Sequence, residues 1–186
     1  NPMHGNIYPE TRELLLGHLS SEEIQQWLIP LGFKRWQATY ERLRRLAEIT
    51  GDPVGMANLL PYLLVMLGNA PTPERVLISL ERFFQRAQHP DVLLHTLSGN
   101  LRGLEILIKL FAGSQFLTEI LLHNPEYLDA LINPQNLAQP KTVARLNAEL
   151  RALEHADGRD LTFDHLRRFQ RRELLRIGGC DLLDLL

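Results

Sequence analysis

The chain has 186 residues, of which 45% are hydrophobic and 23% charged, a balance that is ordinary for a globular protein and argues against disorder. Its formal net charge of -2 gives no general reason to expect a nucleic acid or a membrane surface as partner. The single cysteine, Cys180, allows no internal disulfide, and the uncharged apolar runs are shorter than the roughly 20 residues that span a bilayer, so we expect a cytoplasmic protein without a membrane segment.

Helix starts marked by proline recur along the chain, and no segment is convincing as a strand. The pattern occurs at Asp52-Pro53, Thr72-Pro73-Glu74, His89-Pro90-Asp91 and Asn124-Pro125-Glu126. Proline loses no hydrogen bond at the first helical position, and an acid there meets the positive end of the helix dipole. The side chain of Thr72 or Asn124 can cap the first free amides. Ser20, with Glu23 three residues later, predicts a capping box at a further start.

Apolar residues at helical spacing predict where these helices are buried. Over residues 33–49, one face would carry Trp36, Tyr40, Leu43 and Ala47, and Gly51 would end the helix. Over residues 73–84, the apolar face would carry Val76, Leu77, Leu80 and Phe84. Between them, Pro61 lies in an apolar stretch, where it would either kink a helix or start one.

The rest of the chain continues the same pattern. Helices are predicted over residues 101–111, 114–123, 125–132 and 140–156, and from about Thr162 onward. The fold class is therefore predicted to be all-α, an irregular bundle of about nine or ten short helices that forms one domain over residues 1–186.

No group of residues suggests catalytic or metal chemistry. The histidines lie at His4, His18, His89, His95, His123, His155 and His165, with no HExxH motif and no Cys/His cluster, so structural roles are favoured. Gly178-Gly179 lacks the lysine and the strand–turn–helix context of a phosphate-binding loop. Trp27 and Trp36 are predicted to belong to the core, not to a base-stacking platform. We therefore predict no catalytic, cofactor-binding or metal-binding residue in this chain.

The last predicted helix divides into a basic and an apolar side. The basic side carries Arg167, Arg168, Arg171, Arg172 and Arg176. It is either a solvated face or a docking surface for an acidic partner or for phosphate, since guanidinium forks suit both. Glu173 falls within the apolar arc, where an unpaired carboxylate would be costly, so a structural ion pair with an arginine is predicted for it.

The final residues of the chain break the amphipathic pattern. Four leucines point in several directions around a helix, namely Leu182, Leu183, Leu185 and Leu186. A helix that is apolar all round must be buried. These leucines are therefore predicted to belong to an interface with a further part of a larger protein.

Three stretches of the sequence resemble the bacterial glutamine synthetase adenylyltransferases, also called glutamate–ammonia-ligase adenylyltransferases. Residues 166–186, LRRFQRRELLRIGGCDLLDLL, are similar to the arginine-rich helix that enters the nucleotidyltransferase domain of that family. Residues 113–132, GSQFLTEILLHNPEYLDALI, resemble the family's S-x-F-L-x-x-L-L-x-x-P-E-x-L stretch, and residues 59–85 resemble its helical lead-in more weakly. The resemblance covers residues 59–186 and leaves residues 1–58 unmatched.

The resemblance implies a function for the larger protein and none of its catalytic residues for this chain. The family's enzymes transfer AMP from ATP to a tyrosine of glutamine synthetase and remove it by phosphorolysis, under control of a PII signalling protein. They use a Gly-Ser motif followed by Asp-x-Asp, whose carboxylates hold Mg²⁺ on the triphosphate. Here Gly113-Ser114 has no Asp-x-Asp after it, and Asp181 and Asp184 have two residues between them instead of one. ATP and Mg²⁺ are therefore expected for the parent protein alone.

Two functions are consistent with the sequence. The preferred one is a non-catalytic helical domain that leads into a nucleotidyltransferase domain in cis, with glutamine synthetase and PII as the partners that the resemblance implies. The alternative is a free-standing helical interaction module. Nucleic-acid binding through the basic C-terminal helix is one form that this alternative could take, and nucleic acid is the less expected partner at this net charge. Whether the chain itself has enzyme activity is left open.

Overall fold

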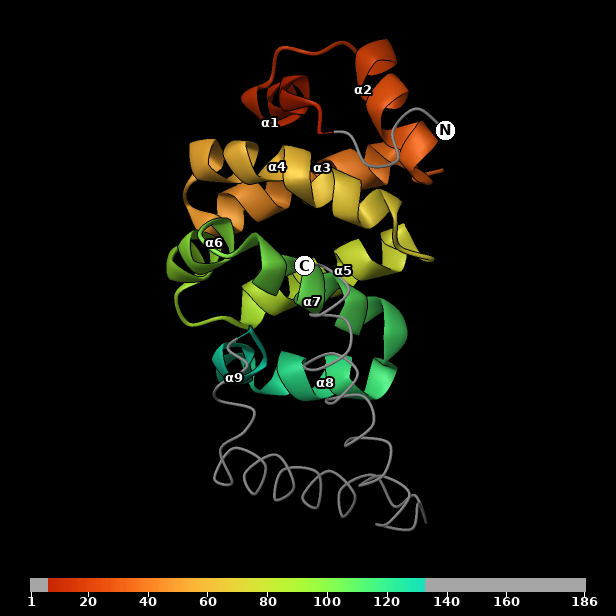
Figure 1. Ribbon diagram of the computed structural model, residues 1–186. Helices are drawn as coiled ribbons and strands as arrows, with labels where there is room; N and C mark the ends of the chain where they lie inside the picture. The colour runs from red at the N-terminus through yellow and green to blue at the C-terminus, as the bar shows by residue number, and fades with distance from the viewer. Residues whose placement is uncertain (1–6, 133–186) are drawn as a thin grey trace. The chain divides into compact units, whose positions relative to one another are not determined.

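The structure is a computed structural model, and it describes residues 7–132 of the chain (Figure 1). Over that range the backbone is helical with no strand, which confirms the all-α prediction. The chain divides into two compact units, Asn1–Thr118 and Glu119–Leu186. The first unit contains the helices α1 (Glu13–Leu16), α2 (Ser21–Leu28), α3 (Trp36–Thr50), α4 (Pro53–Gly68), α5 (Pro73–Arg86), α6 (Pro90–Ser98) and α7 (Leu101–Gly113).

Shorter elements complete the described part. The 3-10 helices η1 (Pro9–Arg12) and η2 (Ile29–Leu31) flank α1 and α2. The helix α8 (Gln115–His123) crosses the boundary between the two units, and η3 (Pro125–Tyr127) and α9 (Leu128–Ile132) follow it in the second unit. The resemblance to the family began at residue 59, a position that lies inside α4.

The helix starts are those that the sequence predicts. Proline occupies the first position of α4, α5, α6 and η3. At α2 the capping box is complete, since the Glu23 amide donates to Ser20 Oγ at 3.3 Å and the Ser20 amide donates to Glu23 Oε2 at 2.8 Å. Each of these bonds satisfies an amide that has no partner within the helix.

The predicted caps at Thr72 and Asn124 are wrong. Neither side chain accepts a bond from the helix that follows it. The Asn124 side chain donates instead to the Ile120 carbonyl at 3.1 Å, because Asn124 also closes the C-terminal end of α8, where carbonyl groups need donors. Side-chain caps are made elsewhere, by Asp52 to the Gly55 amide at 2.8 Å and by Asn100 to the Gly103 amide at 2.9 Å.

The buried face of α3 is rotated from the predicted one. Leu43 and Ala47 are buried as expected, but Trp36 and Tyr40 are only half-buried. The remaining buried positions are Thr39, Leu46 and Thr50. Tyr40 keeps its ring partly in water, where the Arg44 guanidinium lies 5.8 Å from the ring centroid in a cation–π contact. Gly51, with a φ of 66°, ends the helix as predicted.

The helix α4 contributes eight buried residues to the core of the first unit. Figure 1 shows it beside α3, and it also packs against α1, α6 and α7. Its buried apolar side chains fall within an arc of about 160° when successive residues are placed about 100° apart, and they are Met56, Ala57, Leu59, Leu60, Leu63, Leu64 and Leu67. Pro61 lies inside this helix and is buried, so it does not start one.

The helices α5 and α7 also pack against each other in the first unit. All four predicted core residues of α5 are buried, and Phe83 of α5 meets Phe111 of α7 edge-on, with ring centroids 5.9 Å apart. In the second unit, Ile120, Leu121 and Leu122 of α8 are buried, as is Leu128 of α9.

Among residues 7–132, none of the helices combines the length and the hydropathy of a segment that crosses a membrane.

Candidate functional site: a buried glutamate between two arginines

The most unusual polar group of the described residues is the carboxylate of Glu81 on α5. Only 4% of this residue is exposed, and it is the one charged residue in the buried class over residues 7–132. A buried carboxylate is costly unless it is paired and hydrogen-bonded. The surroundings of Glu81 therefore decide how α5 can pack.

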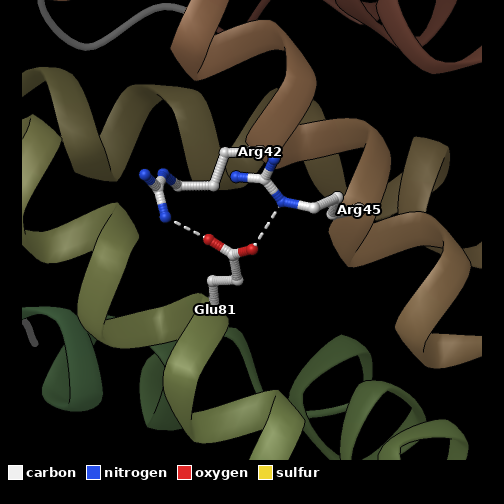
Figure 2. A network of polar contacts seen from close by, with 3 residues as sticks. All are labelled: Arg42, Arg45 and Glu81. Carbon is white, nitrogen blue, oxygen red and sulfur yellow. Dashed lines mark hydrogen bonds and ion pairs between the residues drawn. The ribbon is translucent and has the colours of Figure 1, made fainter.

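Two arginines of α3 supply that pairing. The Arg45 Nε donates to Glu81 Oε1 at 2.8 Å, and the Arg42 Nη1 donates to the other carboxylate oxygen, Oε2. Figure 2 shows both side chains extending from α3 toward α5, so that each carboxylate oxygen faces a different guanidinium. The contact joins residues that are 36 and 39 positions apart in the sequence.

Helical spacing explains why these residues meet. Glu81 lies four residues after Leu77 and three before Phe84, so it stands at the edge of the buried face of α5. Arg42 and Arg45 are three residues apart and therefore lie on the same side of α3. The side chain of Arg42 is 24% exposed and that of Arg45 is 46% exposed, so both reach Glu81 from the rim of the helix contact.

The charges of this cluster reinforce one another. The hydrogen bond from Arg45 to Glu81 raises the pKa of the Arg45 guanidinium, and the charges of Glu81, Glu41 and Glu48 act in the same direction against the effect of burial. Arg45 therefore carries its charge at any physiological pH. Guanidiniums in this state donate hydrogen bonds but do not transfer protons, so the cluster is suited to holding two helices together and not to acid–base catalysis.

A second contact ties the segment before α3 to the start of α5. The Arg35 backbone amide donates to Glu74 Oε1 at 3.2 Å. Gly32, with a φ of 99°, lets the chain pass closely by Pro73, because a Cβ at this position would lie 3.2 Å from the proline ring. The α3 segment is thus fixed on α5 at two places, near Glu74 and at Glu81.

The sequence did not single out Glu81, although a usable signal was present. Glu173 was assigned an ion pair because an acid falls within an apolar helical arc, and Glu81 stands at the edge of such an arc as well. The sequence cannot show which cations would reach Glu81, since Arg42 and Arg45 belong to another helix. A search for acids beside the buried positions of each amphipathic helix would have found the residue but not its partners.

The residues that the sequence proposed as sites lie outside the described part of the chain. This applies to the arginines Arg167, Arg168, Arg171, Arg172 and Arg176, to Glu173, and to the leucines Leu182, Leu183, Leu185 and Leu186. Their roles stay predictions. Over residues 7–132, no three His, Cys, Asp or Glu side chains are grouped so that they could hold a metal ion.

The core assignment of the two tryptophans is wrong. Trp27 and Trp36 are both half-buried. Trp27 packs against Tyr8, with ring centroids 5.3 Å apart and planes tilted by 51°. Large aromatic rings carry a polar edge and are seldom completely enclosed, so helix-edge positions suit them.

The fold and the buried ion pair define a helical module in which apolar packing and the Arg42–Glu81–Arg45 cluster hold helices together. Comparison with known proteins identifies the family that this module resembles. A family model described as glutamate-ammonia ligase adenylyltransferase matches residues 104–186. That range includes the stretches at 113–132 and 166–186, so the resemblance seen in the sequence is confirmed: the chain matches a segment of this family.

Curated relatives extend the similarity to the whole chain. The chain is 30% identical over 195 residues to a bifunctional glutamine synthetase adenylyltransferase/adenylyl-removing enzyme of Mycobacterium leprae, a match that covers 100% of the chain and 19% of the relative. The enzyme of the same name from Thioalkalivibrio sulfidiphilus is 28% identical over 91% of the chain and 19% of its own length. Residues 1–58, which resembled no part of the family at first, are thus covered as well.

The matches also show how much of each relative the chain covers. A third relative of the same name, from Bradyrhizobium, is 31% identical over 81% of the chain and 15% of its own length. The chain therefore spans about a fifth of the length of the curated relatives that it matches. No solved structure matches the chain.

Proposed function

We propose that the chain is a non-catalytic helical domain of a glutamine synthetase adenylyltransferase, and that it supports a nucleotidyltransferase domain in the same protein. The match to one segment of much longer bifunctional enzymes carries this proposal. The absence of the Gly-Ser/Asp-x-Asp pattern from the 186 residues fits a supporting role, because the family's metal-binding carboxylates would then come from another segment.

The structure of the first unit suits such a role. A domain that positions a catalytic neighbour needs helices that keep their relative placement, and positions held by packing and by paired charges are more exact than positions on loops. In this chain α4 supplies the packing, and the Arg42–Glu81–Arg45 cluster fixes how α3 crosses α5.

The remaining parts of the proposal concern the whole enzyme. ATP and Mg²⁺ would bind in the nucleotidyltransferase domain, and we assign no residue of this chain to them. Glutamine synthetase would be the protein substrate, and a PII signalling protein would be the regulator. A cytoplasmic location follows from that substrate and is part of the same proposal.

The experiment compares this chain with the longer protein that contains it. AMP transfer from α-labelled ATP to purified glutamine synthetase is measured with Mg²⁺ for the longer protein, for this chain alone, and for the longer protein without these residues. We expect transfer by the longer protein, none by the chain, and a strong decrease when the helical residues are removed. The control is the activity of the shortened protein after the chain is added back as a separate piece.

Two results would overturn the proposal. Labelling of glutamine synthetase by this chain alone would show that it contains catalytic residues of its own. An open reading frame without a Gly-Ser and Asp-x-Asp motif on either side of these residues would favour the free-standing interaction module.

A further inference from the structure

The helix α4 carries no charged residue. Over residues 7–132, each of the other α-helices contains at least one Asp, Glu, Lys or Arg. Burial explains only part of this difference, because one side of α4 reaches the surface, where Val54 is 55% exposed and Tyr62 is 37% exposed. The exposed side of α3, by contrast, includes the charged residues Glu41, Arg44 and Glu48. The exposed side of α4 is therefore chemically unlike that of its neighbour.

The residues on this side of α4 form one continuous row. Val54, Asn58 and Tyr62 are exposed, and Val65 and Met66 are half-buried. They fall within an arc of about 120° when successive residues are placed about 100° apart, and at about 1.5 Å per residue the row is about 18 Å long. We call these five residues the α4 face. The polar side-chain groups among them are the Asn58 amide and the Tyr62 hydroxyl.

A small hollow adjoins the α4 face at Val65. It is lined by this residue and by the Tyr8–Trp27 ring pair, among others, and has a volume of about 10 Å³. Tyr8, Trp27 and Val65 are each half-buried, so this part of the lining reaches the surface of the unit. A volume of this size takes about one water-sized group, such as a methyl group. Tryptophan and tyrosine are also enriched among the residues that dominate the energy of protein interfaces.

We propose that the α4 face is the contact surface for an uncharged, apolar helix of the longer protein, one that lies outside these 186 residues. A charged occupant would bury its charges opposite a face without counter-charges, which is costly. A helix suits the face because rows of side chains three and four residues apart pack into the grooves of a second helix. The occupant should carry one hydrogen-bonding group opposite Asn58, since buried amides are paired. This surface role rests on the part of the proposed function that makes the chain a domain of a longer protein.

The size of the α4 face favours an occupant in the same polypeptide. A row about 18 Å long on a helix about 10 Å across covers about 200 Å². A stable contact between separate proteins buries about 800 Å² on each partner, whereas contacts between domains of one chain start at about 600 Å² in total, or about 300 Å² on each side. The Tyr8–Trp27 pair extends the face beside Val65 and brings it near the smaller requirement. A covalent link also lowers the contact area that is needed, because it holds the occupant at a high effective concentration.

The length of the relatives leaves ample room for such an occupant. The chain covers 19% of the enzymes from Mycobacterium leprae and Thioalkalivibrio sulfidiphilus, so about four fifths of a protein of that length lies outside it. A second copy of the chain fits less well, since a symmetric pair would bring the same small face from each copy. A separate partner also fits less well, because the face has no charges to guide its approach or to distinguish it from other proteins.

Hydroxyl-radical footprinting tests this surface without altering it. Radicals oxidise exposed methionine and aromatic side chains faster than covered ones, and the α4 face contains Tyr62 and Met66. Oxidation of each residue is measured by mass spectrometry in the chain of 186 residues and in the longer protein. Trp36 and Tyr40 of α3, which are half-buried, are the matched controls. Neither ATP nor glutamine synthetase is added.

We expect Tyr62 and Met66 to be oxidised about fivefold or more slowly in the longer protein than in the chain, and Trp36 and Tyr40 to change by less than about twofold. Equal oxidation of Tyr62 in both proteins, or equal protection of all four residues, would overturn the proposal. Because the measurement requires no catalysis, a protected α4 face in a protein that transfers no AMP would contradict the proposed function alone. AMP transfer by a protein with an unprotected face would contradict the docking surface alone.

A charge placed on the α4 face tests whether the occupant is uncharged. In the longer protein, Asn58→Glu should return the oxidation of Tyr62 to its rate in the chain, because an unpaired carboxylate is costly to bury. Gln37→Glu, at an exposed site on α3, is the control and should leave the protection unchanged. Protection that persists in a folded Asn58→Glu protein would rule out the proposed occupant. If this variant does not fold, as judged by circular dichroism, the comparison of the two unaltered proteins gives the decision.

The chain of 186 residues is used to distinguish the other occupants. Neither dilution nor Asn58→Glu should change the oxidation of Tyr62 in this chain, since the proposed occupant is absent from it. An increase on dilution would assign the α4 face to a contact with a second copy. An increase with Asn58→Glu alone would assign it to a segment of this chain, and either result would overturn the proposal.

Discussion

The helix α4 and the crossing of α3 over α5 hold the first unit together in different ways. Eight residues of α4 are buried, and none of them carries a charge. The α3–α5 crossing adds a buried carboxylate that is paired with two partly exposed guanidiniums. Apolar packing tolerates small changes of register, whereas a carboxylate between two fixed donors allows few. We therefore expect α4 to contribute more to stability and Glu81 more to the choice of packing.

Shortening a side chain of α4 should have the largest effect. Leu63 is 0% exposed, and Leu63→Ala would leave a cavity among helices that pack on several sides. The expected loss is about 2–5 kcal/mol in the free energy of unfolding. Urea denaturation followed by circular dichroism measures it. Val54→Ala, at a site that is 55% exposed on the same helix, is the control and should change the free energy by less than about 0.5 kcal/mol.

The next effect concerns the charged cluster. Arg42→Ala combined with Arg45→Ala would leave the buried Glu81 carboxylate without its partners. Removal of a partner from a fully buried pair costs about 3–5 kcal/mol, and the exposure of Arg45 reduces the expected loss to about 2–3 kcal/mol. Glu81→Met removes the charge and keeps the volume, so its effect on stability should be within about 1 kcal/mol.

Comparing these two variants shows whether the cluster stabilises the fold or selects one packing of α3 on α5. If Glu81→Met is as destabilising as the double arginine variant, the cluster is a net source of stability, and the distinction drawn between α4 and the α3–α5 crossing is wrong. If it is nearly neutral but broadens the amide spectrum of α3 and α5 in NMR, the cluster selects one packing among several.

A substitution at Gly51, which connects α3 to α4, should change the free energy of unfolding by a smaller amount. Gly51 joins α3 to α4 with a φ of 66°, and a Cβ there would meet nothing within 4 Å. Gly51→Ala should therefore cost about 1–2 kcal/mol through backbone strain alone. Gly51→Asn should cost less, since asparagine adopts this conformation more readily. A loss well above this range would mean that the turn also controls how α3 and α4 pack.

The sequence predicted local features better than contacts between helices. The proline-marked starts, the Ser20 capping box and the end of α3 at Gly51 depend on a few adjacent residues, and each is present in the structure. The face of α3 was misplaced because Tyr40 is amphipathic and its neighbours decide which side of it is covered. Pro61 lies within a helix for a similar reason, since the packing around α4 outweighs the local cost of a proline.

The partners of Glu81 at the candidate site, like the buried face of α3, could not be predicted from the local sequence. A buried acid at the edge of an apolar arc can be suspected from spacing alone, as was done for Glu173. The partners of Glu81 come from a helix 36 to 39 residues earlier, and only the packing of α3 on α5 brings them together. The family resemblance, by contrast, depended on short motifs that survive in the sequence, and the comparisons confirmed it.

The smallest expected effect lies outside both regions, at the capping box of α2. Ser20 and Glu23 are exposed, and each satisfies one amide of the other's backbone. Ser20→Ala should cost about 0.5–1 kcal/mol, whereas Ser20→Asp should be nearly neutral because an aspartate can also accept the Glu23 amide. Thermal melting of the two variants side by side measures the difference. Since the capping bonds of Ser20 and Glu23 share no residue with the Glu81 cluster, we expect the Ser20→Ala loss to add to that of the double arginine variant within about 0.5 kcal/mol. A loss that is clearly more than additive would show that the cap of α2 and the α3–α5 crossing are coupled through α3, and the two parts of the first unit could then no longer be treated as independent.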